Sequence, residues 1–380
     1  MTTGLKRIDL QPYLRREPVT LALLTGLAII LFGVVTGLAS LYHRQQESLA
    51  DRWASRGADD LKAKRYGEAV MAYRTALLYA RDEYTYQLNL AEALVGEHRA
   101  EEAYAYLINL WDRQPENGMV NLELARIQAA RGHTDSALRY YHDAIYAIWP
   151  ANQELESRNA RLELIRLMLQ TNDKAQADSE LIALAANLGE RPAEHTQTGQ
   201  LFLEAQDYQR ALEQFRLALE GNHREVTAMA GAGEAAFQLG QYRVAEQYLR
   251  RAAGAGDKSS KAKLKLAELV LNMDPFRTQL RAAERRRIII DAFTAAGARL
   301  QACSKPGPFT VPASELATLT QSWTELKPQI NERNLSRNPD LGTNAMSLVF
   351  NIEHETSGMC GGMTDTDNAL LLVANLHQGL

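Results

Sequence analysis

The segment from residue 354 to residue 367 concentrates the residue types that carry out chemistry. In "HETSGMCGGMTDTD", His354, Cys360, Asp365 and Asp367 lie within 14 residues. Such a group could hold a metal ion or activate a cysteine nucleophile, but its spacings match no established metal motif. Three glycines indicate a loop instead, and Thr364 with Asp367 resembles the capping box that opens a helix. We therefore predict neither a metal site nor a catalytic residue in this segment.

Other signatures of catalysis are also missing from the sequence. It contains no GxxxxGKS/T phosphate loop, no HExxH zinc motif and no GxSxG nucleophile elbow. We predict no enzyme and no cofactor; an enzyme hidden in the C-terminal region is the disfavoured alternative. The net charge of −4 is too small to indicate a nucleic-acid partner, and no basic run is interleaved with aromatic residues.

The chain has two cysteines, Cys303 and Cys360. In an oxidising compartment they could pair, and closing a loop of that size would contribute about 4 kcal/mol in the chain-entropy model. In a reducing compartment they would be two unrelated thiols. We expect a disulfide, whose presence would also report the compartment.

A repeat organises the middle of the chain. Alanine recurs every 34 residues, the register slips by six residues after Pro150, and the spacing then resumes. The positions are Ala69, Ala103, Ala137, Ala177, Ala211 and Ala245. A period of this size is typical of solenoids, whose units bury their apolar faces by stacking. Apolar residues at spacings of three and four predict two amphipathic helices per unit. Gly132, Asn172 and Gly240 mark the break between them, where a left-handed helix end favours glycine or asparagine.

The stretch "WASRGADDLKAKRYGEAVMAYRTALLYARD" resembles the tetratricopeptide repeat family, whose preferred positions are occupied by Trp53, Gly57, Tyr66, Ala69, Tyr73 and Ala76. The resemblance covers residues 50 to about 257. It implies an all-α fold, a superhelix of helical hairpins, with about six units near 50–83, 84–117, 118–151, 158–191, 192–225 and 226–257.

Members of this family usually bind protein ligands on the concave face formed by the first helix of each unit. By this resemblance, the groove residues are Lys62, Leu88, Glu92, Leu122, Arg126, Leu162, Arg166, Gln200, Leu203, Glu234 and Phe237. Because Arg126 and Arg166 lie among apolar anchors, we expect a peptide with an apolar face and one or two acidic groups. The lysine and asparagine clamp that holds acidic chaperone tails in some members is absent, which disfavours that ligand.

Residues 19–41, "VTLALLTGLAIILFGVVTGLASL", contain no charge and are long enough to cross a hydrocarbon core of about 30 Å. We predict a transmembrane helix after a tail at 1–18. A buried core helix and a cleaved signal peptide are alternatives, although the run exceeds the roughly 7 to 15 residues usual for the latter. Gly33 and Gly37 form a GxxxG motif that could seat a homodimer.

The orientation of this helix rests on the charges that flank it. Basic residues precede it at Lys6, Arg7, Arg15 and Arg16 and follow it at Arg44, Arg52 and Arg56. The positive-inside rule then predicts, by a margin of one charge, a cytoplasmic N-terminus and an extracytoplasmic body.

The chain changes character after the repeats. Residues 258–287 hold nine Lys or Arg and three acidic residues. Residues 258–303 could be basic capping helices with a solvated face. Alternatively, they could form a docking patch for an acidic partner or anionic lipid headgroups, centred on Arg281, Arg285, Arg286 and Arg287. We expect a linker at 304–313 and a helical domain at 314–380.

These observations predict a membrane-anchored scaffold or adaptor that binds protein partners, in envelope assembly or secretion. We expect a single-pass protein of a bacterial inner membrane, with its N-terminus in the cytoplasm and its body in the periplasm. The alternative is a cytosol-facing membrane receptor for client proteins, which requires the opposite topology.

Overall fold

The computed structural model describes residues 11–303, 313–357, 360 and 362–377. Residues 1–10 of the expected tail and residues 304–312 of the expected linker lie outside the described residues. Within the described part the chain is helical, with no β-strand, and it divides into two compact units at Leu164 and Ile165. The fold is all-α, as the sequence predicts.

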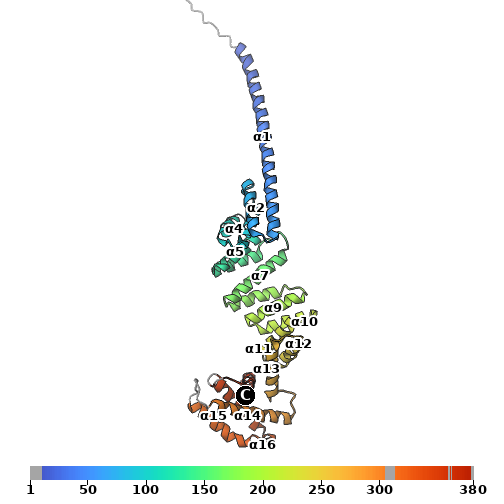
Figure 1. Ribbon diagram of the computed structural model, residues 1–380, viewed down its shortest axis with the longest axis vertical. Helices are drawn as coiled ribbons and strands as arrows, with labels where there is room; N and C mark the ends of the chain where they lie inside the picture. Colours follow the sequence, from blue (N-terminus) through green and yellow to red (C-terminus); the bar gives the residue numbers. More distant parts are fainter. Residues whose placement is uncertain (1–10, 304–312, 358–359, 361, 378–380) are drawn as a thin grey trace, which may run out of the picture. The chain divides into compact units, whose positions relative to one another are not determined.

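Unit 1 is a run of helical hairpins (Figure 1). Its helices are α1 (Gln11–Lys62), α2 (Tyr66–Tyr79), α3 (Tyr84–Gly96), α4 (Ala100–Arg113), α5 (Gly118–Ala130), α6 (Thr134–Tyr146) and the first part of α7 (Gln153–Gln170). From α1 to α6, each helix packs on the next, and α1 also contacts α3. This is the hairpin arrangement of tetratricopeptide repeats.

Unit 2 continues the repeat and then adds a helical domain. Its helices after α7 are α8 (Lys174–Ala185), α9 (Pro192–Ala205), α10 (Tyr208–Gly221), α11 (Val226–Gln238), α12 (Tyr242–Gly254), α13 (Ser260–Met273), α14 (Ala282–Cys303), α15 (Ala313–Leu326), the 3-10 helix η1 (Lys327–Gln329), α16 (Glu332–Arg337), α17 (Pro339–Ser357) and α18 (Asp365–Leu376). From α8 to α13, each helix packs on the next.

The same turn separates the two helices of each repeat. A residue with positive φ stands at Lys64, His98, Gly132, Asn172, Gln206 and Gly240. At each turn the amide of this residue donates to the carbonyl three residues back, and the next amide donates to the carbonyl five residues back. This is a Schellman motif, which satisfies carbonyls at the helix end. The predicted breaks at Gly132, Asn172 and Gly240 are confirmed.

Small residues let the two helices of a hairpin approach closely. All six periodic alanines, from Ala69 to Ala245, have no exposed surface. Gly57 faces Tyr73 in the first hairpin, and a Cβ added to this glycine would lie 2.9 Å from the tyrosine ring. Gly199 and Phe215 repeat this contact at the same distance in unit 2. The alanine period therefore reflects close packing in the interior of each hairpin.

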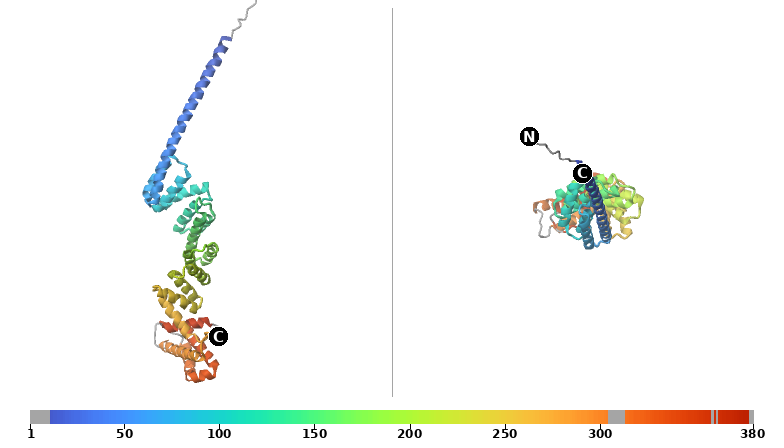
Figure 2. Two further views of the ribbon diagram at one scale, coloured as in Figure 1. Left: turned by 90° about the vertical axis from the view of Figure 1, so that its right-hand side faces the viewer. Right: turned by 90° about the horizontal axis from the view of Figure 1, so that it is seen from above.

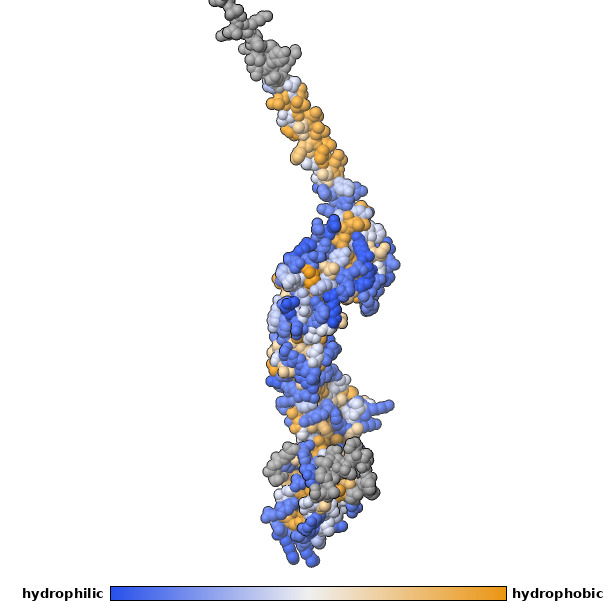
Figure 3. All heavy atoms as spheres, turned by 90° about the vertical axis from the view of Figure 1, so that its left-hand side faces the viewer, coloured by the Kyte–Doolittle hydropathy of each residue, from blue (hydrophilic) through white to orange (hydrophobic). Residues whose placement is uncertain are grey.

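Helix α1 extends well beyond the hairpin that it forms with α2 (Figure 2). Its Thr20–Lys62 portion is the one helix in the described chain that is long and apolar enough to cross a membrane, by length and composition. The apolar side chains lie open to the surroundings, as at Phe32, which is 70% exposed. Figure 3 shows them as a hydrophobic band that ends where the polar surface of the hairpins begins.

The end of unit 2 has a core of its own. Ile289 and Phe293 of α14 are buried with Met346 and Val349 of α17. Helix α13 packs both on α12 and on α18, and α14 shares its core with the C-terminal helices.

Replacing Gly132 by alanine should destabilise the protein by about 1 to 2 kcal/mol, because a left-handed conformation brings Cβ too close to the backbone. Gly132→Asn is the matched control and should cost much less, since Asn172 already occupies the same turn position. Thermal unfolding followed by circular dichroism measures both. Equal melting temperatures for the two variants would contradict the assignment of this turn.

Candidate functional site

By the resemblance to tetratricopeptide repeats, the inner face of each unit is expected on the first helices of its hairpins. These are α1, α3, α5 and α7 in unit 1, and α9, α11 and the following α13 in unit 2; α1 contacts α3, and α11 contacts both α9 and α13. The residues that the sequence assigns to a groove lie on these helices. They differ widely in accessibility, which decides which of them could meet a partner.

Two expected apolar anchors of unit 1 belong to its interior. Leu88 of α3 and Leu122 of α5 are 8% and 5% exposed, respectively. Lys62 at the end of α1 is exposed, whereas Glu92 of α3 and Leu162 of α7 are half-buried. The accessible part of this face is therefore mainly polar.

Arg126 of α5 is held by two carboxylates. Its Nε and Nη2 donate to Glu163 of α7 at 2.9 and 2.6 Å, and its Nη1 donates to Glu123 one turn earlier on α5. The Tyr141 hydroxyl donates to the same Glu163 at 3.3 Å. A bidentate pair of this kind is geometrically specific. The arginine that we expected to meet an acidic group on a partner is already engaged within the chain.

Burial and charge act together on these carboxyl groups. Burial raises the pKa of Glu123, and the neighbouring Arg126 opposes that rise. Burial also raises the pKa of Glu92, and the charge of Glu123 raises it further. Glu123 of α5 and Glu163 of α7 thus share one guanidinium, and the charges of Glu123 and Arg126 act in opposite directions on the pKa of Glu92 of α3.

The inner face of unit 2 contains a cavity of about 290 Å³. Gln200 and Leu203 of α9 line it together with Glu234 of α11, so the structure brings three expected groove residues together. Lys263 of α13 also lines the cavity and forms an ion pair with Glu234. Phe237, another expected groove residue, is 8% exposed, and the Lys263 ammonium nitrogen lies 6.0 Å from the centroid of its ring. Arg166 of α7 is exposed.

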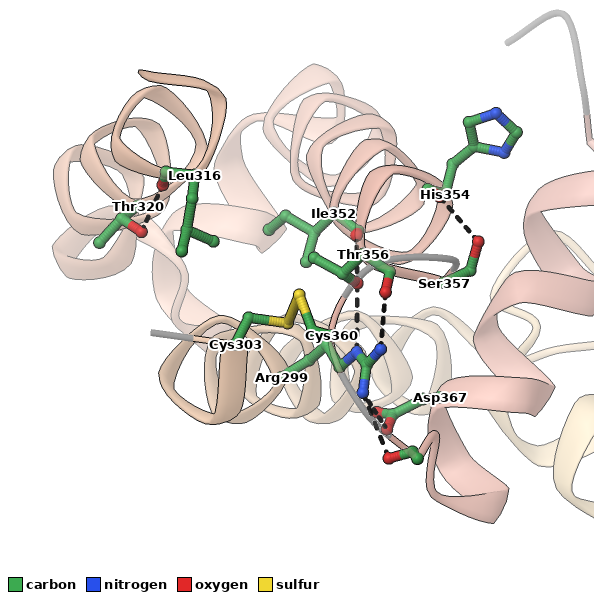
Figure 4. The surroundings of a disulfide bond; sticks show 11 residues. Arg299, Cys303, Leu316, Thr320, Ile352, His354, Thr356, Ser357, Cys360 and Asp367 are labelled. Carbon is green, nitrogen blue, oxygen red and sulfur yellow. Dashed lines mark hydrogen bonds and ion pairs between the residues drawn. A yellow bond between two sulfur atoms is a disulfide. The ribbon is translucent and has the colours of Figure 1, made fainter. Parts of the chain in front are cut away.

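A disulfide joins Cys303 of α14 to Cys360, with the two Cα atoms 5.0 Å apart (Figure 4). Beside it lies Arg299, which is 3% exposed. Its Nη2 donates to the Thr356 carbonyl at 2.7 Å and its Nε to the Thr356 hydroxyl at 3.2 Å. Arg299 therefore ties α14 to the end of α17.

Two polar residues of the cysteine segment cap a helix. Thr364 and Asp367 form the capping box of α18, with Thr364 N donating to Asp367 Oδ2 at 2.8 Å. The capping box predicted from the sequence is confirmed. His354 is exposed on α17. Among the described residues, no group of three or more His, Cys, Asp or Glu could hold a metal ion.

Glu353 of α17 is a buried carboxyl with no exposed surface. Neither of its oxygens has a hydrogen-bond partner in the described part of the chain. Burial is the main cause that raises its pKa to about 8, and the charge of Asp367 adds to it while Arg299 opposes it. Glu353 is therefore largely protonated at neutral pH.

The arginines of the expected basic patch are partly engaged. Arg285 donates to the Pro275 carbonyl at 2.9 Å, Arg286 pairs with Glu332 at 3.4 Å, and Arg287 lies 3.8 Å from Asp291. Arg281 is exposed. Two of these contacts hold the start of α14 to neighbouring parts of its own unit.

The sequence reasoning missed Glu123, Glu163 and Lys263. Glu123 and Glu163 are separated by 40 residues, the 34-residue period plus the slip of six, so they occupy the same position of the repeat. Recurrence of an acidic residue at an inner position was the available signal. Lys263 follows the last hairpin, where the repeat register offers no guide.

No protein-family model matches the chain. No curated protein matches it either. Solved structures do, among them PilF of Pseudomonas aeruginosa, with 14% identity and a TM-score of 0.43 over 58% of this chain and 98% of that one. PilW, a type IV pilus biogenesis factor, has 13% identity and a TM-score of 0.42 over 57% and 98%. YrrB, a tetratricopeptide repeat protein with an unusual peptide-binding site, has 14% identity and a TM-score of 0.41 over 51% and 97%. These similarities concern the fold alone.

Replacing Glu353 by glutamine should flatten part of the dependence of stability on pH. At pH values between the ordinary pKa of 4.5 and the raised pKa of about 8, Glu353 keeps in the folded state a proton that it releases in the unfolded state. The free energy of unfolding of the unmodified protein therefore falls as pH rises through this window, by up to about 1.4 kcal/mol per pH unit. Glutamine has no proton to release, so Glu353→Gln should not lose stability in this way. The free energy of unfolding of the variant should therefore rise relative to that of the unmodified protein as pH increases.

Denaturant unfolding at a series of pH values measures this effect. The neighbouring Glu355→Gln, at a partly exposed position, is the matched control and should leave the pH profile unchanged. Parallel profiles for the unmodified protein and Glu353→Gln would show that Glu353 titrates normally.

Proposed function

We propose that this protein is a membrane-anchored scaffold that binds protein partners through the inner faces of its helical hairpins. The observation that carries the proposal is the continuity of α1. One helix, Gln11–Lys62, contains both the exposed apolar run and the first helix of the repeat array. At its far end, Ala50 is 1% exposed and Gly57 packs on Tyr73, so this end is part of the folded body.

The exposed run fits a bilayer better than water. Large apolar side chains from Leu21 to Leu41 are 52 to 70% exposed around the whole helix. A contiguous apolar surface of this kind marks a contact with a membrane or another protein. A helix satisfies its backbone hydrogen bonds internally, which permits it to cross hydrocarbon. The proposed span is residues 19–41.

The repeat array supplies the binding surface. Successive first helices present accessible polar groups, such as Lys62 in unit 1 and Gln200 in unit 2, beside packed apolar residues. Near the disulfide, the buried Arg299 and Asp367 have structural roles, Arg299 as a link between α14 and α17 and Asp367 in the capping box of α18. Binding of protein segments, which needs only complementary side chains on a fixed frame, is the activity that this surface supports best.

The proposed location is a bacterial inner membrane, with the N-terminus in the cytoplasm and the body in the periplasm, where the scaffold would serve envelope assembly or secretion. The Cys303–Cys360 disulfide supports an oxidising compartment, since such bonds persist outside the cytosol. A homodimer through Gly33 and Gly37 is part of the proposal. A Cβ at either glycine would have no neighbour within 4 Å, so a second helix could approach there.

Photo-crosslinking in intact cells tests the binding surface. A photoreactive amino acid at Lys62 or at Gln200, both exposed on inner faces, should yield discrete protein adducts. The same residue at Asn109 of α4 or Arg216 of α10, exposed on second helices, is the matched control and should yield none. Adducts restricted to the control positions, or the absence of adducts from all four, would refute binding through the inner faces.

The redox state of the two cysteines tests the compartment. In intact cells, a bulky maleimide should shift the mobility of the protein only after reduction, because both sulfurs are bonded. A variant with Cys303→Ser should instead react without reductant if the reagent reaches the body, which controls for access. Reaction of both native thiols without reductant would favour the cytosol-facing receptor.

A further inference from the structure

Two cavities open on the surface of unit 2 where α12, α13 and the loop after α13 meet. Their volumes are about 420 and 410 Å³. Arg243 of α12, Leu271 of α13 and Arg277 of the loop line both of them, so the two cavities adjoin. We call Arg243 and Arg277 the arginine pair. Because α12 is the second helix of its hairpin, the arginine pair lies outside the surface that the proposed function uses.

The arginine pair has no carboxylate partner in the part of the chain that the structure describes. Arg243 Nη1 donates to the side-chain oxygen of Gln279 at 3.0 Å, and Arg277 Nε donates to the Asp274 carbonyl at 3.3 Å. Both acceptors are neutral, so these contacts orient the two guanidinium groups without neutralising them. Arg277 is half-buried, where an uncompensated charge costs more than on an open surface.

The acidic side chains around the two cavities already have partners. Glu246 and Glu268, which line the first cavity, both pair with Arg250. Asp274, which lines the second cavity, lies 3.1 Å from His377 Nε2. Among the described lining residues, three arginines stand against two carboxylates in the first cavity, and two arginines against one carboxylate in the second. Each cavity therefore has an excess of positive charge.

The lining indicates which kind of anion fits. A guanidinium group binds a carboxylate through two parallel hydrogen bonds. In the second cavity, Val244 and Leu271 are half-buried and Leu376 is 45% exposed. An inorganic anion would leave this apolar surface uncovered. A polypeptide segment with carboxylates and an aliphatic side chain would satisfy both parts of the lining.

We propose that the arginine pair and its two cavities bind an acidic segment of a protein partner. Carboxylates of the segment pair with Arg243 and Arg277, and an aliphatic side chain covers Leu376. This second docking site goes beyond the proposed function, since it does not use the inner faces. It also differs from the basic patch expected at residues 281–287, which follows it in the chain.

The test uses the full chain in detergent micelles and a resin-bound library of random dodecapeptides. Retained peptides should be enriched in aspartate and glutamate together with aliphatic residues. Fluorescence anisotropy then measures the affinity of a labelled, retained peptide. Arg243→Gln combined with Arg277→Gln should weaken its binding by at least about tenfold, which corresponds to about 1.4 kcal/mol. Arg243→Lys combined with Arg277→Lys keeps the charges but loses the planar fork of donors, so its loss should be smaller.

The matched control removes two positive charges elsewhere in unit 2. Arg216→Gln with Arg224→Gln changes the net charge equally at exposed positions that line neither cavity, and should leave the affinity within about twofold. Circular dichroism checks that both double variants are folded. If the variant of the arginine pair fails to fold, the single Arg243→Gln, at an exposed position, should weaken binding by at least about threefold, as expected for one exposed ion pair.

The other outcomes would overturn the inference. Retention of basic or uncharged peptides alone, or of no peptide, would exclude an acidic segment as the ligand. An acidic preference that survives Arg243→Gln with Arg277→Gln unchanged would place the binding on another surface. Displacement of the labelled peptide by glycerol phosphate, much more strongly than by acetate at equal ionic strength, would assign the arginine pair to anionic lipid headgroups. Each of these results leaves the photo-crosslinking test of the inner faces unaffected, so the two proposals fail separately.

Discussion

The left-handed residue that ends the first helix of each hairpin is the constraint on which the rest of the structure depends. It recurs at six places from Lys64 to Gly240, each with the same pair of backbone hydrogen bonds. By fixing the reversal of the chain, it fixes which faces of the two helices meet, and hence where the small residues must be. Gly57 against Tyr73 and Gly199 against Phe215 are consequences of the same turn geometry.

On the inner face of unit 1, the repeat brings charged side chains of different helices together. Because the repeat position is preserved, Glu123 of α5 and Glu163 of α7 come to flank Arg126, which links two helices through three nitrogen atoms. Such a link resists sliding of one hairpin past the next, since the bidentate contact tolerates little change of angle.

Much of the fold could be predicted from the sequence, because the features that set it are local and periodic. The alanine period indicated the hairpins, and Gly132, Asn172 and Gly240 indicated three of the six turns. Lys64, His98 and Gln206 could not be found in this way: their conformation is imposed by the packed hairpins and is not indicated by residue type. The groove residues were the least predictable part. Leu88 and Leu122 have the spacing of exposed positions yet are buried, and the pairing of Arg126 depends on a residue in another repeat. Likewise, the apolar stripe of α14 did not reveal that its partner would be α17.

The continuity of α1 has a mechanical consequence. Among the described residues no loop separates its apolar run from the hairpin it forms with α2. The apolar run and the first helix of that hairpin are therefore parts of one continuous helix. Each residue of an α-helix turns the chain by about 100°. The length of helix between Leu41 and Ala50 therefore sets the rotational phase of the first hairpins relative to the apolar run. In a membrane, any tilt or rotation of that run would swing the first hairpins by the same angle.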